Sequence, residues 1–237
     1  MTISNDSRTR IKKVFEPIAL GMGRLGLTPD ALTMIGFAVT VVGAILLSQQ
    51  LWLAGGLVIL FGGVFDMFDG TLARATNRVS RLGAFMDSVF DRAGEVIVYI
   101  GIVFGLEELG ILHGPLFAVA ALGSAVMVSY TRAKSEGLGF TAGTGMAAIG
   151  VMPREVRLLL LSLGLILGGI LGTQPYLVDG ANGAGGAAFP VGAYAILLAL
   201  GIITIGATIT VIQRILHVRD QAIRQSIQTS QEHGERT

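Results

Sequence analysis

Four aspartates stand close together in the sequence, in two pairs with helical spacing. Asp66 and Asp69 are three residues apart, and Asp87 and Asp91 are four residues apart. Spacings of three and four place each pair on one face of a helix. Because the segment between the pairs is short, we expect two antiparallel neighbouring helices whose four carboxylates converge in one cavity.

Such a cluster needs cations, because carboxylates repel one another and are unfavourable in hydrocarbon by at least a few kcal/mol each. Arg74 and Arg92 are the only nearby basic residues at a comparable depth, too few to neutralise four acids. Hard oxygen ligands suit Mg²⁺ or Mn²⁺, and neither His nor Cys stands nearby to favour zinc. Two such ions roughly 3.5–4 Å apart can clamp a phosphoryl group during its displacement. The pattern therefore predicts metal-dependent phosphoryl chemistry at the four aspartates.

Two residues beside the aspartates are suited to a phosphorylated substrate. Gly70 follows Asp69 directly, and Arg74 lies one turn further along the same expected helix. A residue without Cβ lets a phosphate or ribose approach the helix backbone, and an arginine can pair with a phosphate. Taken singly, Gly70 is better explained by helix packing and Arg74 by an interfacial side chain. Their placement among four aspartates favours substrate binding for both.

The composition places this chemistry in a membrane. Of the 237 residues, 52% are apolar and 14% are charged, whereas soluble domains carry about 25% charged residues. The absence of Cys excludes disulfides, thiolate metal sites and cysteine nucleophiles. A net charge of only +1 gives no bulk field that would attract nucleic acid. We therefore expect a polytopic protein whose large partner is the lipid bilayer and not a nucleic acid.

Six stretches are apolar and long enough to cross a bilayer, which takes about 20 residues as a helix. They are 31–51, 53–74, 83–106, 115–134, 154–173 and 190–217. Before them, apolar and basic residues mix over 8–25, which is typical of an amphipathic helix lying in the membrane interface. An ordinary cytosolic helical cap is the alternative for this segment.

The predicted fold class is all-α, with six transmembrane helices and an N-terminal amphipathic interfacial helix. One membrane domain is expected over residues 1–225. It consists of a cytosolic juxtamembrane helix within 1–30 and a six-helix core over 31–217. The polar residues 226–237 are expected to form a disordered tail.

Basic residues sort to one side of this topology. Lys and Arg occur in the N-terminal segment, the second and fourth connections and the C-terminal tail, and the other three connections have none. The positive-inside rule therefore puts both termini and the aspartates on the cytosolic side. The resulting prediction is a multi-pass protein of the cell membrane with a cytosolic active site.

The complete aspartate pattern resembles the signature of the CDP-alcohol phosphotransferases. It reads Asp-x2-Asp-Gly-x2-Ala-Arg-x8-Gly-x3-Asp-x3-Asp from Asp66 to Asp91, and all eight positions match in type and spacing. The resemblance covers nearly the whole chain. It implies that the four aspartates hold two Mg²⁺ or Mn²⁺ ions, that Asp91 is the general base, and that the protein is a homodimer.

The same resemblance implies a CDP-lipid site. Its residues would be Asp30, Thr33, Gly70, Arg74 and Ser80, with CDP-diacylglycerol as the substrate. As plain sequence, Thr28 and Asp30 also fit a helix start at which either side chain can act as the cap.

A second basic set stands at the cytosolic ends of three expected helices and consists of Arg132, Lys134, Arg154 and Arg214. Together they suit one phosphate group, although flanking positive charge explains them nearly as well. The surrounding residues resemble the phosphatidylinositol-phosphate synthases of actinobacteria, in which cationic residues at these places hold inositol phosphate. This implies transfer of a phosphatidyl group from CDP-diacylglycerol to inositol phosphate, with release of CMP. Glycerol-3-phosphate is the alternative acceptor, since it too carries a phosphate.

Readings from other classes are a transporter that uses intramembrane acids and a purely structural membrane protein. The aspartates cluster at one depth instead of lining a path across the membrane, which favours the enzyme. Glu95, one turn beyond Asp91, stays open between a partner of Arg92 or of the metal site and a protonated acid facing another helix. Arg157 is interpreted as flanking positive charge.

Overall fold

The computed structural model describes residues 17–140, 149–173, 177–178, 186–187 and 190–234, without the side chains of 66–67, 177–178, 186–187 and 227–234. Within this part, residues 17–24 are helical, and six longer helices follow. They are α2 (Pro29–Ser48), α3 (Trp52–Ala75), α4 (Arg81–Glu108), α5 (Gly114–Gly137), α6 (Arg154–Leu171) and α7 (Val191–Gly234). Each lies on one of the six predicted apolar stretches, so the all-α fold class is confirmed.

Two very short strands lie between α6 and α7. β1 (Leu177–Val178) pairs antiparallel with β2 (Gly186–Ala187), with Leu177 opposite Ala187. This ladder is far too short to change the helical class of the fold.

A hydroxyl side chain caps the first turn of α2 and of α4. The Thr28 hydroxyl accepts a hydrogen bond from the Ala31 amide at 3.2 Å, and Pro29 occupies the first turn of α2. The Ser80 hydroxyl accepts from the Gly83 amide at 2.9 Å at the start of α4. Both arrangements satisfy amides that a helix start leaves free. Of the two caps predicted for α2, Thr28 is the one that forms.

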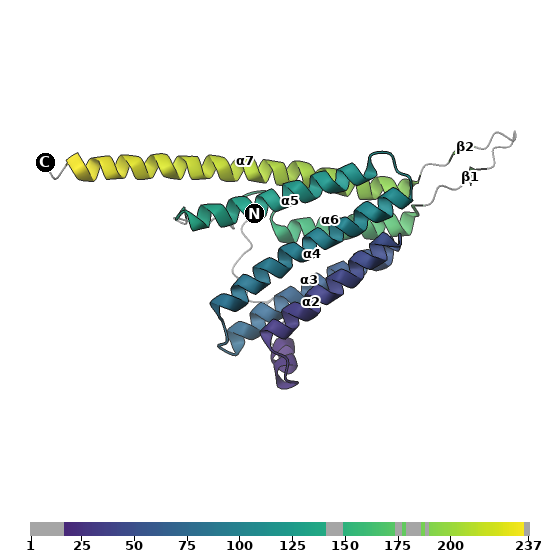
Figure 1. Ribbon diagram of the computed structural model, residues 1–237, viewed down its shortest axis with the longest axis horizontal. Coiled ribbons are helices and arrows are strands. Elements are labelled where there is room, and N and C mark those ends of the chain that lie inside the picture. Colours follow the sequence, from purple (N-terminus) through teal and green to yellow (C-terminus); the bar gives the residue numbers. More distant parts are fainter. Residues whose placement is uncertain (1–16, 141–148, 174–176, 179–185, 188–189, 235–237) are drawn as a thin grey trace.

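The six helices form a ring in which each packs against two neighbours: α2 on α3 and α4, α3 on α6, α6 on α7, α7 on α5, and α5 on α4. They lie close together at the end near β1 and β2 and spread apart toward the opposite end (Figure 1). We call these the packed end and the open end.

α3 and α4 line one cleft, in agreement with the prediction that they are neighbours, but they are not packed against each other. The two helices make almost no contact in the described part of the chain, because α2 packs against both of them. Glycine explains this preference at α4, where a Cβ on Gly101 would lie 2.3 Å from the carbonyl oxygen of Ala44 in α2. The backbones of α2 and α4 therefore touch. α3 and α4 diverge toward the open end.

The packed end holds the main hydrophobic core. Its largest buried side chains come from all six helices except α5, which contributes alanines. They are Leu47, Trp52, Ile59, Tyr99, Ile102, Leu106, Leu165, Ile196 and Leu200.

Four of the described helices, α2, α3, α5 and α7, are long and apolar enough to cross a membrane. α4 and α6 are helical where spans are predicted, but they carry charged residues in their first turns. A membrane protein with at least this many apolar helices is therefore supported, while the count of six spans stays a prediction.

The structure describes only part of the N-terminal segment, and it shows a longer C-terminal helix than predicted. Residues 1–16, which include the first half of the predicted interfacial helix, lie outside the described part. The helical residues 17–24 pack Ala19 against Leu32 and Leu72. At the other end α7 is helical as far as Gly234, beyond residue 226, and the sequence there contains no Pro that would end the helix.

Candidate active site

A cleft opens where α3 and α4 diverge, with the start of α2 behind it. We call it the α3–α4 cleft. Seven of the residues singled out from the sequence line it together: Asp30, Thr33, Asp69, Gly70, Arg74, Ser80 and Asp87. The structure therefore brings the whole predicted CDP-lipid set to one surface, beside two of the four aspartates.

Asp69 is the most deeply placed acid of this cleft, with 5% of the residue exposed. Its carboxylate accepts a hydrogen bond from the Thr33 hydroxyl at 2.7 Å and another from the Gly70 amide. A buried carboxylate needs such donors. Thr33 therefore orients Asp69 from the neighbouring helix α2, a role that its position in the sequence did not reveal.

Gly70 and Arg74 form a unit on the wall of the cleft. A Cβ on Gly70 would lie 3.4 Å from Nη1 of Arg74, so the guanidinium lies over the bare backbone. Across the cleft, a Cβ on Gly83 would lie 3.0 Å from the Ser80 hydroxyl and 3.5 Å from Oδ1 of Asp30. The two glycines leave room for polar groups at positions where a side chain would fill the cleft.

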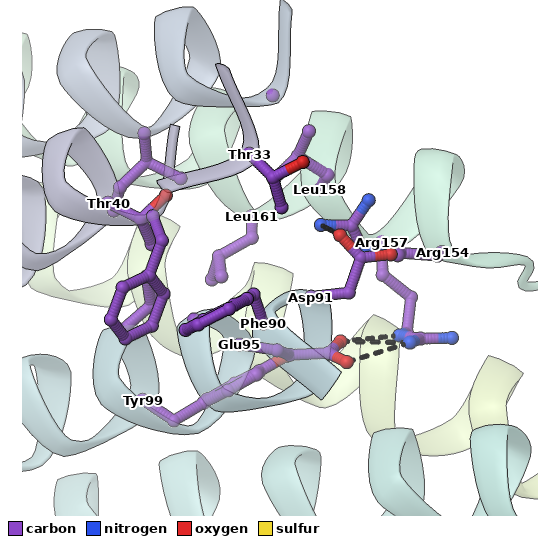
Figure 2. Close-up of a pocket in the computed structure, with 15 residues that line it drawn as sticks. Thr33, Thr40, Phe90, Asp91, Glu95, Tyr99, Arg154, Arg157, Leu158 and Leu161 are labelled. Carbon is purple, nitrogen blue, oxygen red and sulfur yellow. Dashed lines mark hydrogen bonds and ion pairs between the residues drawn. The ribbon is translucent and has the colours of Figure 1, made fainter. Parts of the chain in front are cut away.

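Asp91 lies one turn further along α4 and faces a second space, the central cavity between α2, α3, α4 and α6. Its Oδ1 is 2.8 Å from Nη2 of Arg154, and its Oδ2 is 3.1 Å from Nη1 of Arg92. Figure 2 shows the acids of α4 directed across the cavity toward the arginines of α6. Thr33 lines both the α3–α4 cleft and the central cavity, so the two spaces adjoin.

Glu95 faces the same cavity and binds Arg157, not Arg92. Arg157 donates from Nε to Oε1 at 3.0 Å and from Nη2 to Oε2 at 3.1 Å. The interpretation of Arg157 as flanking charge is wrong, because only 2% of its side chain is exposed. The sequence could not show this pairing, since the partners stand 62 residues apart.

A cationic pocket adjoins the central cavity on the side of α5 and α7. Its lining includes Arg92, Arg132, Arg154, Arg157 and Arg214. Three of the four residues predicted to bind the acceptor phosphate therefore meet there, and Lys134 is exposed at the end of α5 and does not line it.

Arg154 pairs with Asp91, and the other two arginines predicted to bind the acceptor phosphate, Arg132 and Arg214, also have protein partners. Arg132 pairs with Glu136 one turn along α5, at 2.9 Å, with both side chains exposed. Arg214 is 3% exposed and donates from Nε to the Ile149 carbonyl at 3.1 Å and from Nη1 to the Val128 carbonyl. Arg214 thus ties α7 to α5 and to the segment before α6, as well as lining the pocket.

The predicted metal ligands are only partly described. Asp66 lies in α3, but its side chain is outside the described part, and among the described side chains no three acids or imidazoles form a ready cluster. Asp69 and Asp87 both line the α3–α4 cleft, and their carboxylates are hard oxygen donors. Their type and the burial of Asp69 fit a divalent ion of the Mg²⁺ or Mn²⁺ kind.

With this fold and site in place, comparison with known proteins defines the class. Residues 26–219 match the family model of the CDP-alcohol phosphatidyltransferases, and the chain belongs to this family. The matched region contains the α3–α4 cleft, the central cavity and the cationic pocket.

Several curated relatives are named phosphatidylinositol phosphate synthase or archaetidylinositol phosphate synthase. The phosphatidylinositol phosphate synthase of Cutibacterium acnes is 34% identical over 213 residues, which is 87% of this chain and 93% of that protein. That of Streptomyces avermitilis is 29% identical and covers 96% of this chain and 87% of its own length. The archaetidylinositol phosphate synthase of Pyrococcus horikoshii is 34% identical over 65% of this chain and 77% of its own length.

Solved structures of a protein with the same name are similar to this chain in fold. The phosphatidylinositol phosphate synthase of Mycobacterium tuberculosis with bound CDP-DAG superposes with a TM-score of 0.67 at 27% identity, covering 87% of this chain and 94% of that one. The same protein in complex with manganese and citrate also gives a TM-score of 0.67, covering 86% of this chain and 88% of that one.

Proposed function

We propose that this enzyme transfers a phosphatidyl group from CDP-diacylglycerol to a hydroxyl of inositol phosphate and releases CMP. One observation carries the proposal: Arg154 lines both the central cavity and the cationic pocket, and its guanidinium is 2.8 Å from Asp91. A phosphorylated acceptor held by Arg154 would have its hydroxyls beside that carboxylate. The names of the relatives support inositol phosphate as the acceptor.

The three spaces give each substrate a place. The CDP moiety would occupy the α3–α4 cleft, against Gly70 and Arg74 and between Asp30 and Ser80. The acceptor phosphate would lie in the cationic pocket against Arg132, Arg154 and Arg214. Thr33 joins the cleft to the central cavity, and Arg154 joins the central cavity to the pocket. The reacting groups would therefore meet near Asp91.

In the reaction, Asp91 takes the proton from the acceptor hydroxyl. The resulting oxygen forms a bond to the phosphorus that carries the diacylglycerol. The bond from that phosphorus to the pyrophosphate oxygen breaks, and CMP leaves with the electron pair. General-base assistance of this kind contributes about 10²–10⁴-fold to the rate.

We propose that Asp66, Asp69, Asp87 and Asp91 hold two divalent ions, Mg²⁺ or Mn²⁺. When bound, such ions supply charge that polarises a pyrophosphate and stabilises the departing nucleotide. The manganese in the Mycobacterium tuberculosis structure and the oxygen donors of the cleft support this ligand set.

We also propose that α4 and α6 cross the bilayer with the four most apolar helices. The ring of six helices supports this, since α4 and α6 each pack between two other helices. Both termini and the open end would then face the cytosol, as the distribution of basic residues predicts. The juxtamembrane helix, the homodimer and the role of Lys134 stay predictions.

An acceptor panel tests the function. Purified protein in detergent micelles would be given CDP-diacylglycerol, Mg²⁺ and one acceptor at a time: inositol phosphate, inositol, glycerol-3-phosphate or serine. CMP release with inositol phosphate alone is the expected result. Release with glycerol-3-phosphate in preference would replace the proposed acceptor with the alternative one, and release with neither phosphate would contradict the proposal.

A further inference from the structure

The open end of the ring contains a gap between α4 and α6. The described residues of α4 pack on α2 and α5, and those of α6 pack on α3 and α7, but these two helices are not packed on each other. The central cavity lies between them. The relative position of α4, which carries Asp91, and α6, which carries Arg154, is therefore not set by direct helix packing.

Two ion pairs cross this gap, one turn apart. Arg154 reaches Asp91 at 2.8 Å, and Arg157 reaches Glu95 through two of its nitrogens, at 3.0 and 3.1 Å. The first pair joins residues assigned above to the reaction. The second lies deeper, with 2% of the Arg157 side chain and 13% of the Glu95 side chain exposed. The bidentate geometry fixes both distance and orientation.

Arg157 also anchors the chain that leads into α6. Its Nη1 donates to the Met152 carbonyl at 3.2 Å, and the Met152 amide donates to the Thr210 hydroxyl of α7 at 3.0 Å. Pro153 follows Met152 and precedes Arg154, the first residue of α6. A continuous set of contacts thus runs from α4 through Arg157 to the start of α6 and on to α7.

We propose that Glu95 and Arg157 are positioning residues: their ion pair sets the spacing of α4 and α6 and so places Arg154 opposite Asp91. This inference rests on the proposed function only in giving Arg154 the acceptor phosphate. During turnover Arg154 would exchange its contact with Asp91 for the phosphate. The deeper pair would then hold the two helices in register.

The experiment uses the double variant Glu95→Met with Arg157→Met. Removing one partner alone leaves a buried charge and destabilises the fold, whereas replacing both by apolar side chains of similar volume is often tolerated. The single variants are therefore expected to unfold at a lower temperature than the double variant. The control is Glu107→Met, which removes an exposed acid from the other end of the same helix.

Because the chain has no Cys, spin labels can be attached at Leu82→Cys in α4 and Leu159→Cys in α6. Both side chains are exposed, at 70% and 58%. Pulsed EPR should give one narrow distance distribution in the parent and in the Glu107→Met control. In the double variant it should broaden and shift to longer distances. An unchanged distribution in a folded double variant would overturn the proposal, whatever the enzyme's acceptor.

Kinetics separate positioning from simple structural support. In the double variant the KM for inositol phosphate should rise, and kcat/KM for this acceptor should fall by up to about 10²-fold, the loss that a misplacement of about 1 Å can cause. The KM for CDP-diacylglycerol should change little, because the α3–α4 cleft does not contain the pair. Equal changes in both KM values, or none in either, would contradict a positioning role. Inactivity of the parent with inositol phosphate would instead refute the proposed function, and the EPR distances would still decide the role of the pair.

Discussion

The two ends of the helix ring are built from the same helices by different means. At the packed end, glycines bring backbones into contact and aliphatic and aromatic side chains fill the interior. At the open end the helices spread, and buried polar and charged side chains connect them. α4 belongs to both ends, with Gly101 against α2 at one and Asp91 and Glu95 at the other.

This difference shows how a membrane protein can hold a polar site without losing its fold. Small residues permit close helix approach, which favours association in lipid. The close contacts confined to the packed end leave the other end free to diverge around substrates. Stability and chemistry should therefore respond to different substitutions, and the following experiments test that separation in order of expected effect.

Asp91→Asn should have the largest effect. It keeps the size of the side chain but removes the base, so kcat should fall by about 10²–10⁴-fold while the protein still folds. CMP release and thermal unfolding, measured on the same preparation, check this. Asp220→Asn, an exposed acid of α7, is the matched control. Turnover of the Asp91 variant at the parent rate would rule out the general-base assignment.

Arg154→Gln should act on the acceptor side of the open end. A lost hydrogen bond to a charged group corresponds to about 1.5–3 kcal/mol, or roughly 10–100-fold in the KM for inositol phosphate. The KM for CDP-diacylglycerol should stay close to that of the parent. Arg219→Gln removes an exposed arginine of α7 and should leave both constants within about twofold. An unaltered KM for inositol phosphate in the Arg154 variant would contradict the proposal that the acceptor phosphate binds in the cationic pocket.

Gly101→Ala should break the packed end and spare the chemistry. The new Cβ would lie 2.3 Å from the Ala44 carbonyl oxygen, and overpacking of this kind typically destabilises by about 1–3 kcal/mol. Thermal unfolding should shift downward, while the KM values of the protein that remains folded are unchanged. Gly123→Ala, where a Cβ meets nothing within 4 Å, should not lower the unfolding temperature. Equal behaviour of the two variants would contradict the close α2–α4 contact.

Thr33→Val should have the smallest effect. It removes the hydroxyl that donates to Asp69 at 2.7 Å and keeps the shape, so a loss of about 1 kcal/mol, or roughly fivefold in kcat/KM, is expected. Thr204→Val is the control, because its hydroxyl bonds only within α7, to Leu200, among the described contacts. A Thr33 variant as active as the Thr204 variant would show that Asp69 needs no support from α2.

Much of the fold could be predicted because hydropathy and helix length are local properties. All six apolar stretches became helices, and the aspartate signature located the α3–α4 cleft, since residues at fixed spacing on one helix necessarily share a face. The basic residues at the ends of three predicted helices also indicated Arg132, Arg154 and Arg214, which meet in the cationic pocket.

The rest depended on which helices pack together, and nothing local in the sequence states that. The short segment between α3 and α4 indicated that these helices are neighbours, but it did not show that α4 packs against α2, where Gly101 brings the two backbones together. Arg157 looked like any flanking arginine because its partner Glu95 is far away in the chain. Arg214 was expected to face a phosphate. Its hydrogen bonds to the carbonyls of Ile149 and Val128 could not be predicted, because these residues are far from Arg214 in the sequence.

The length of α7 has a practical consequence. Its 44 residues correspond to a length of about 66 Å at the helical rise. The hydrocarbon core of a bilayer is about 30 Å thick, so the helix is more than long enough to cross it. If the apolar first part of α7 crosses the bilayer, the remainder of the helix would extend beyond the hydrocarbon core. A fluorescent protein or affinity tag fused beyond α7 would lie far from the α3–α4 cleft, so tagging there should leave catalysis unchanged.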